Sequence, residues 1–174
     1  MPGKRLAVLL LLAALPPPAA AQKQCWICSD AEAERRKNWT ESEPQLPAYP
    51  KPDNLIRFDA GAATPHRFYV DAPSLSVGED GVVRYTLVVK TAGGATNVTF
   101  EGIRCDTREQ KLYATGQRED KWVPVRDPQW RYIEHKDFNR HYLALYAEFF
   151  CGDTRTTSPK QMVDALKRAS AQLR

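Results

Sequence analysis

Two cysteines with the spacing C-x-x-C, Cys25 and Cys28, follow a short apolar segment near the N-terminus. This spacing occurs in thiol oxidoreductases, in zinc sites and, where histidine follows directly, in attachment sites for c-type haem. Ser29 follows Cys28, which excludes the standard haem attachment. Zinc would need two further ligands at a matching spacing, and the sequence places none nearby.

Thiol-redox chemistry at this pair would need a cysteine at the start of a helix inside a βαβ scaffold, where the helix dipole lowers the thiol pKa. Ser29 and Glu32 have the spacing of a capping box, so we expect a short helix over residues 30–37. The βαβ pattern is absent, however. A structural disulfide between Cys25 and Cys28 is the favoured interpretation, and thiol-redox activity is the alternative.

The other two cysteines, Cys105 and Cys151, lie at the ends of predicted elements. Cys105 ends a strand, and Cys151 ends an amphipathic helix expected to pack on the same sheet. Four cysteines in an exported chain are expected to be oxidised, in one of three possible pairings. We favour the pair Cys105 and Cys151, which would close a loop of about 47 residues and contribute about 3 to 4 kcal/mol.

His135, Asp137 and His141 could in principle supply metal ligands, because imidazole and carboxylate groups suit zinc. Positions six residues apart do not share a helix face at about 100° per residue. The three residues are therefore interpreted as the solvated start of a helix.

The remaining carboxylates show no general acid and base pair. Glu79 and Asp80 belong to a predicted turn, and Glu101 is isolated, with Thr86 expected opposite it. No G-x-S-x-G, H-E-x-x-H or glycine-rich phosphate loop occurs. The sequence thus shows no catalytic constellation and implies no cofactor.

A segment after the predicted sheet mixes aromatic and cationic side chains and is broken by two prolines. Such side chains can stack on sugars or contact a partner protein, and Trp, Tyr and Arg dominate interface energetics. The predicted contact surface consists of Trp122, Arg126, Trp130, Arg131 and Tyr132. Burial of both tryptophans is the alternative.

The N-terminus has the pattern of a secretory signal peptide: basic Lys4 and Arg5, an apolar run over residues 6–15, and small residues ending at Ala21. The run is about half the length that spans a bilayer. The chain has 25 basic and 21 acidic residues, and cleavage near Ala21 removes two basic ones. The resulting net charge, near +2, predicts no nucleic-acid partner.

Three regions are predicted: the signal peptide at residues 1–21, a helix and proline-rich arm at 22–53, and a single domain at 54–174. The domain is expected to be α+β, because predicted strands come first and helices last. It should contain an antiparallel β-meander of four to five strands, covered by a C-terminal amphipathic helix and followed by a further terminal helix. A small half-open β-barrel is the alternative fold.

The centre of the meander is the strand over residues 82–91, whose residues alternate between two faces. The core face should carry Val83, Tyr85, Leu87 and Val89, and the opposite face Arg84, Thr86 and Lys90. Asp80-Gly81 predicts a hairpin before this strand, and Gly93-Gly94 a turn after it. A two-residue turn would pair Val89 with Val98, Leu87 with Phe100, and Tyr85 with Gly102.

The covering helix is expected over residues 137–150, because apolar residues recur there with helical spacing. Its apolar stripe comprises Phe138, Tyr142, Leu145 and Phe149. Ser158 and Pro159 should begin the last helix.

The strings FYVDAPSLSVGEDGVVRYTLVV, NVTFEGIRC and YATG, followed by Trp130, resemble the cryptic neisserial protein-like family of exported bacterial proteins. The resemblance runs from Trp39 to Cys151. It implies bacterial origin, a periplasmic location and one small domain, but transfers no catalytic residue. We therefore expect a periplasmic, non-catalytic binding module whose partner is an envelope protein or cell-wall ligand, with a thiol-redox protein acting through Cys25 and Cys28 as the alternative.

Overall fold

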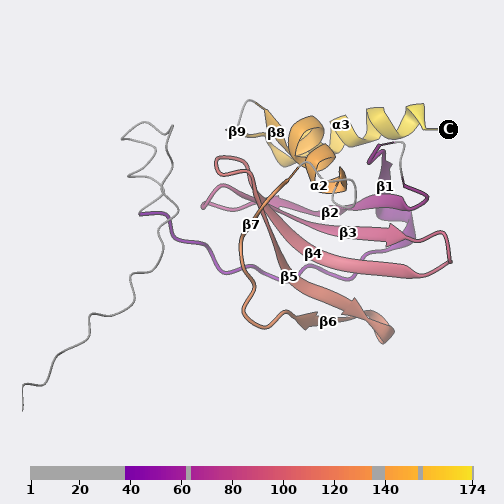
Figure 1. The fold of residues 1–174 in the computed structure, drawn as a ribbon, viewed down its shortest axis with the longest axis horizontal. Coiled ribbons are helices and arrows are strands. Elements are labelled where there is room, and N and C mark those ends of the chain that lie inside the picture. The colour runs from indigo at the N-terminus through magenta and orange to yellow at the C-terminus, as the bar shows by residue number, and fades with distance from the viewer. Residues whose placement is uncertain (1–37, 62–63, 135–139, 153–154, 174) are drawn as a thin grey trace, which may run out of the picture. The chain divides into compact units, whose positions relative to one another are not determined.

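The computed structural model describes residues 38–61, 64–134, 140–152 and 155–173 (Figure 1). The chain divides into two compact units, Met1–Asn38 and Trp39–Arg174. The described part of the proline-rich arm therefore belongs to the same unit as the sheet. The predicted signal peptide and the helix predicted before residue 38 lie outside the described residues.

A single antiparallel meander dominates the second unit, in the strand order β1-β2-β3-β4-β5-β6, and β7 pairs with β5. The strands are β1 (Leu55–Phe58), β2 (Arg67–Val77), β3 (Val82–Lys90), β4 (Thr96–Arg104), β5 (Glu109–Gln117), β6 (Lys121–Pro124) and β7 (Arg131–Tyr132). The predicted antiparallel meander is confirmed. The sheet has more than the four to five predicted strands because β1 and β7 are too short to give a clear alternating pattern.

Helices lie along one face of this sheet, at the top of Figure 1. They are α2 (Arg140–Ala144), the π-helical segment η4 (Leu145–Phe150) and α3 (Pro159–Gln172). A small hairpin of β8 (Cys151–Gly152) and β9 (Arg155–Thr156) connects them, and the 3-10 turns η1 (Pro52–Asn54) and η2 (Arg118–Asp120) flank the sheet. The mixed α+β fold is confirmed.

The last helix, α3, begins where the sequence predicts. Ser158 Oγ accepts the Gln161 N–H, and the Gln161 side chain accepts the Ser158 N–H, which completes a capping box at the start of α3. Leu145 and Phe149 of the predicted stripe are buried. The covering helix is split into α2 and η4, and Phe138 lies outside the described residues.

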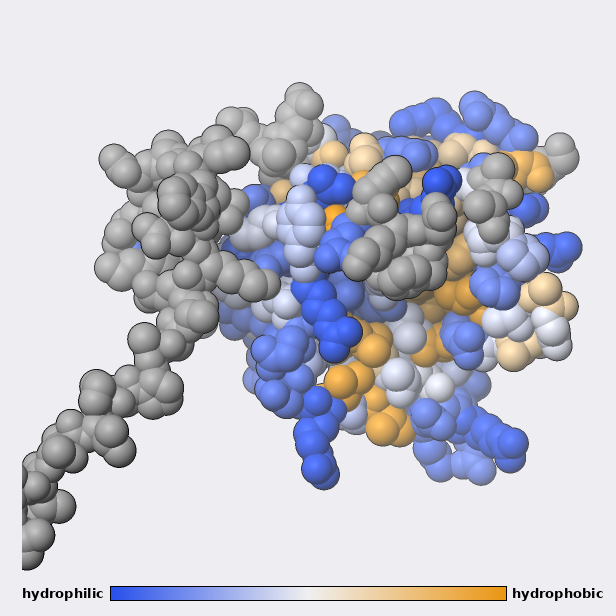
Figure 2. Space-filling model, viewed as in Figure 1, coloured by the Kyte–Doolittle hydropathy of each residue, from blue (hydrophilic) through white to orange (hydrophobic). Residues whose placement is uncertain are grey.

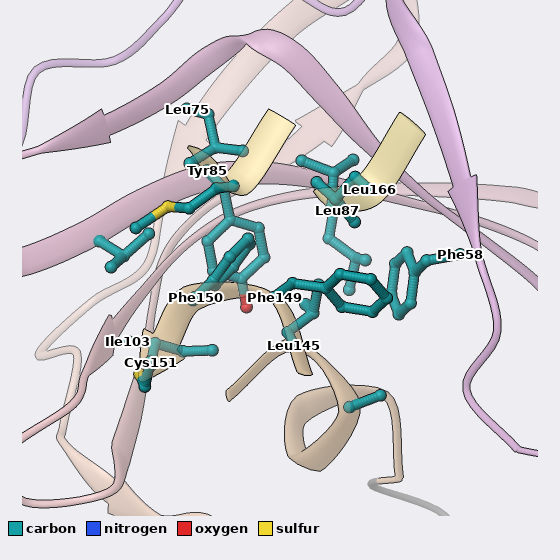
Figure 3. Close-up of a cluster of buried hydrophobic side chains, with 14 of the residues drawn as sticks. Phe58, Leu75, Tyr85, Leu87, Ile103, Leu145, Phe149, Phe150, Cys151 and Leu166 are labelled. Carbon is teal, nitrogen blue, oxygen red and sulfur yellow. The ribbon is translucent and has the colours of Figure 1, made fainter. Parts of the chain in front are cut away.

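The main core fills the space between the helices and the sheet (Figure 3). Phe149 of η4 packs against Phe58 of β1, with ring centroids 6.0 Å apart, and Phe150 packs edge-on against Tyr85 of β3 at 5.0 Å. Each fully buried side chain of this size contributes roughly 1.5 to 3 kcal/mol. Sequence-distant elements are therefore held together mainly by apolar contacts.

A disulfide joins the end of β4 to the end of η4. Cys105 and Cys151 are bonded, with their Cα atoms 5.5 Å apart, and both residues are buried in the core. This is the predicted pair. Cys25 and Cys28 lie outside the described residues, so their pairing and the thiol-redox alternative stay predictions.

The register of β3 and β4 differs by one residue from the predicted one. Val88 pairs with Val98, and Tyr85 pairs with Glu101. The connecting loop is longer than two residues, because the Thr91 N–H donates to the Ala95 carbonyl and Gly94 adopts a φ of 85°. This geometry is typical of a three-residue hairpin loop with glycine in the left-handed region.

A one-residue slip moves every side chain of β4 to the opposite face. Phe100 therefore leaves the main core and forms a second, smaller core with Tyr113, Ala114 and the partly buried Trp122. Gly102 is covered by an aromatic ring as predicted, but the ring belongs to Tyr113, whose hydroxyl would lie 2.6 Å from an added Cβ.

Candidate functional site

The second face of the sheet is covered by residues 39–51, which we call the arm. The arm is extended, as expected for a segment with prolines at positions 44, 47 and 50, and it runs beneath the sheet in Figure 1. On β3, the residues that face the arm are Arg84, Thr86 and Val88, and each is at most 5% exposed. At β3 the sheet is therefore buried on both faces, whereas the sequence predicted a core on one face.

Asp80 anchors the first part of the arm to the turn between β2 and β3. Its carboxylate accepts the Ser42 N–H at 2.9 Å, and its backbone carbonyl accepts the indole N–H of Trp39 at 2.9 Å. Gly81 in the same turn has a φ of 75°, and the Gly78 N–H donates to the Val82 carbonyl, which confirms the predicted hairpin.

Arg84 pairs with Asp80 under the arm. The two side chains are only 7% and 1% exposed, and Arg84 Nη2 lies 2.6 Å from Asp80 Oδ2. The same nitrogen donates to the Ser42 carbonyl at 2.8 Å. Burial alone would raise the pKa of Asp80, but hydrogen bonds from Arg84, Ser42 and Val82 hold that pKa below its usual range.

Glu41 forms the second anchor of the arm. Its carboxylate accepts hydrogen bonds from Lys111 Nζ at 2.7 Å, the Tyr113 hydroxyl at 2.8 Å and the Trp130 indole at 3.2 Å. Burial opposes ionisation of Glu41, but these donors prevail and lower its pKa. The carboxylate thus stays ionised and holds the arm near β5.

The indole groups of Trp39 and Trp130 complete this anchor. They pack edge-to-face with centroids 6.0 Å apart, and the Arg104 guanidinium lies 3.7 Å from the Trp39 ring centroid. Cation–π contacts at such partly desolvated positions contribute about 1 to 2 kcal/mol.

A third anchor holds the end of the arm. The Trp122 indole donates to the Pro47 carbonyl at 2.9 Å, and the Tyr49 ring packs on Trp122 at 5.3 Å. Gly116 makes room for this packing, because an added Cβ would lie 2.6 Å from the Tyr49 hydroxyl. Proline-rich peptides are likewise recognised by docking on aromatic side chains.

The five residues of the predicted contact surface are thus divided by the structure. Trp122 and Trp130 are partly buried and hold the arm, as in the alternative interpretation, whereas Arg126, Arg131 and Tyr132 are exposed. Neither Glu41 nor Asp80 was predicted as an arm contact. The sequence held one hint that the arm makes contacts, because aromatic residues occur in this proline-rich segment.

Glu101 lies in the main core, and the register places it opposite Tyr85 and not opposite Thr86. Its Oε2 accepts the Tyr85 hydroxyl at 2.8 Å, and its Oε1 accepts the hydroxyls of Thr99 at 2.7 Å and Tyr142 at 3.2 Å. Burial raises the pKa of Glu101, although the three hydroxyl donors oppose it. The network links β3 and β4 to α2.

Replacing Glu101 by glutamine should change how stability depends on pH. A carboxyl whose pKa is raised in the folded state binds its proton more tightly there, so the free energy of unfolding falls as pH rises from the unfolded value to the folded one. Glu101→Gln should remove this fall and be more stable than wild type at neutral pH by roughly 1 kcal/mol. Urea denaturation of both proteins at pH 4 and pH 7 measures this difference in the free energy of unfolding.

Glu119→Gln is the matched control, because that carboxylate is 76% exposed. The control should follow the wild-type pH profile. A Glu101→Gln profile parallel to that of wild type would show that the buried carboxylate does not titrate differently in the folded state.

Of the three residues interpreted above as possible metal ligands, His141 is the one within the described residues. His141 stacks on Phe68 with ring centroids 5.0 Å apart, and burial lowers its pKa to about 4. His135 and Asp137 lie outside the described residues. Within the part of the chain that the structure describes, no three His, Cys, Asp or Glu side chains are grouped to hold a metal ion.

These features define an α+β domain in which an antiparallel meander is covered by helices on one face and by a proline-rich arm on the other. Residues 34–167 match the model of the CNP1-like family, so the chain belongs to that family. The match confirms the predicted resemblance and extends past Cys151 into α3. Comparisons with curated proteins and with solved structures gave no match. Among the described helices, none has the length and apolar character needed to cross a membrane.

Proposed function

We propose that this protein is an exported, non-catalytic interaction module of the bacterial cell envelope. The observation that carries the proposal is the exposure of large apolar side chains at the β6 and β7 edge of the sheet. Val123 is 47% and Tyr132 54% exposed. Figure 2 shows hydrophobic residues in the lower part of this face, where Figure 1 draws β5 and β6.

The chemistry of this edge suits a protein or cell-wall partner. Arg126 and Arg131 are exposed and belong to the same chain segment as Val123 and Tyr132, and the Arg108 guanidinium lies 5.3 Å from the ring centroid of Tyr132. A stacked tyrosine loses little conformational freedom on binding, and tyrosine and arginine are enriched among energetically dominant interface residues. We call Val123, Arg126, Arg131 and Tyr132 the edge surface.

Export is supported by two features. The N-terminal basic residues, short apolar run and small residues ending at Ala21 have the pattern of a cleaved signal peptide. The disulfide between Cys105 and Cys151 needs an oxidising compartment, which in bacteria is the periplasm.

A photo-crosslinking amino acid at position 132, tested in the bacterial envelope, should yield a discrete adduct. The same amino acid at Lys167 on α3 is the control, because that residue is exposed on another element. Arg131→Ala should weaken the adduct at position 132. An adduct pattern identical at positions 132 and 167, or none at position 132, would contradict the proposal.

Alanine substitutions should separate the edge surface from the arm anchors. Trp130→Ala should lower the free energy of unfolding by about 2 to 4 kcal/mol, slightly less than for a fully buried aromatic residue, because Trp130 is only partly buried. Tyr132→Ala should change it by less than about 1 kcal/mol. Urea denaturation measures both; equal losses would mean that Tyr132 is structural and that the edge surface is wrongly assigned.

A further inference from the structure

A solvent-open cavity of about 190 Å³ lies between the arm and β2, apart from the edge surface. Its lining comprises Pro47, Ala48, Tyr49, Lys51, Asn54, Asp71, Pro73 and Ser74. The volume exceeds the roughly 150 Å³ of an engineered apolar cavity that holds benzene, and it is smaller than the about 300 Å³ at which sites for drug-sized ligands begin. The space therefore suits a small organic molecule.

An irregularity in β2 places Asp71 at this cavity. Asp71 pairs with Thr86 and Ser76 pairs with Arg84, so the four residues between Asp71 and Ser76 stand opposite Tyr85 alone. One of the four is Pro73, which has no N–H to donate to a ladder. Bulges of this kind redirect side chains and are frequent next to functional sites.

Asp71 is only 3% exposed, and its Oδ1 has no hydrogen-bond partner. Thr86, directly across the ladder, is fully buried, and its hydroxyl oxygen also lacks a partner. Ser74 Oγ donates to the Asp71 backbone carbonyl at 2.7 Å and accepts the Thr86 N–H at 2.8 Å. Burial raises the pKa of Asp71 and outweighs the opposing effect of Ser74.

We propose that the cavity binds a small organic ligand through an ammonium group that pairs with the Asp71 carboxylate. A buried carboxylate oxygen without a donor is destabilising, and Oδ1 of Asp71 is such an oxygen even though Ser74 hydrogen-bonds the carboxyl group. A ligand ammonium supplies both the opposite charge and N–H donors. Because the last side-chain bond of aspartate rotates over a broad range, either carboxylate oxygen can turn toward the cavity. Pro47 and Pro73 provide apolar walls for the rest of the ligand.

Two kinds of ligand with an ammonium group would fit the cavity, a simple amine and a free amino acid. A simple amine would use Asp71 and the apolar walls. A free amino acid would also place its carboxylate near Lys51, the cationic residue in the lining. The proposal does not depend on the edge surface, because none of the edge-surface residues lines the cavity.

NMR titration of the mature full chain with propylamine, alanine and 1-propanol tests the proposal. Propylamine, alanine or both should shift the amide signals of Ala48, Ser74 and Thr86, and 1-propanol, which lacks the charge, should bind at least tenfold more weakly. Asp71→Asn should weaken ammonium binding at least tenfold. Asp164→Asn, a change of the same type on α3, should leave it unchanged.

The remaining variants distinguish the two sources and keep the test valid if Asp71→Asn does not fold. Lys51→Met should weaken binding of alanine alone if the ligand is an amino acid, and should leave propylamine binding intact. Ala48→Trp, a change at an exposed residue of the lining, should block both probes. Equal binding of 1-propanol, undiminished binding to Asp71→Asn, or no shift up to 20 mM of either ammonium probe would overturn the proposal.

Discussion

Replacing Asp80 by alanine is expected to lower the free energy of unfolding by about 3 to 5 kcal/mol, the range for breaking a buried ion pair from one side. Both side chains are less than 10% exposed. Without Asp80, Arg84 would therefore carry a buried charge with no carboxylate paired to it. The Ser42 N–H would also lose its acceptor. The loss should exceed that of any exposed ion pair in the described chain.

Urea denaturation measures this loss, and Asp164→Ala is the matched control. Asp164 pairs with Lys160 across one turn of α3, but the two side chains are 46% and 90% exposed. Such pairs contribute only about 0.3 to 0.5 kcal/mol. If Asp80→Ala costs no more than Asp164→Ala, the arm does not depend on its anchor at Asp80.

The double variant Asp80→Ala with Arg84→Ala separates pairing from burial. If most of the loss comes from the unpaired Arg84 charge, the double variant should be more stable than Asp80→Ala alone.

The free energy of unfolding should also depend on pH through the ionisation of Asp80. Because the pKa of Asp80 is lowered in the folded state, its contribution is present above the unfolded value of 3.8 and is lost as pH falls through the folded value.

The period-two pattern of β3 predicted its core face, since Val83, Tyr85 and Leu87 are all buried on the helix side. It could not predict that the opposite face is also buried. Alternation records only which residues are polar. Arg84 is polar yet buried, because its two terminal nitrogens donate to Asp80 and to the Ser42 carbonyl. A charge that is paired within its own hairpin and covered by a distant segment looks like a solvent-facing charge in the sequence.

The register of β4 could not be predicted for a related reason. Gly93-Gly94 is compatible with loops of two or three residues, and the choice decides which face receives Phe100. Both faces offer an aromatic neighbourhood, because Tyr113 and Trp122 form the second core. Hydrophobicity alone therefore does not distinguish the two registers.

The candidate site was predicted only in part for the same physical reason. Trp122 and Trp130 were predicted to belong to a contact surface, with burial as the alternative, but their indole N–H groups donate to Pro47 and Glu41 of the arm. Contacts across 75 to 89 residues of chain leave no local spacing to detect. Asp71 was missed because the segment was interpreted as a continuous strand, although Pro73 within it is a recognised signal of a bulge.

The disulfide was predictable because it depends on element ends and not on register. Cys151→Ser should lower the free energy of unfolding by about 2 to 5 kcal/mol, since the bridge closes a loop of 46 residues in sequence separation and its loss enlarges the unfolded ensemble. The change should be made with Cys25→Ser and Cys28→Ser present, so that Cys105 cannot form another bridge.

Urea denaturation with and without a thiol reductant measures the contribution of this bridge. Reductant should destabilise the parent with serine at positions 25 and 28, and should leave the Cys151→Ser variant unchanged. The pair Cys105→Ala with Cys151→Ala is the control for burying a serine hydroxyl, because both positions are less than 10% exposed. If the alanine pair is as stable as the oxidised parent, the bridge contributes nothing to stability, and the noncovalent contacts of the core hold the helices on the sheet.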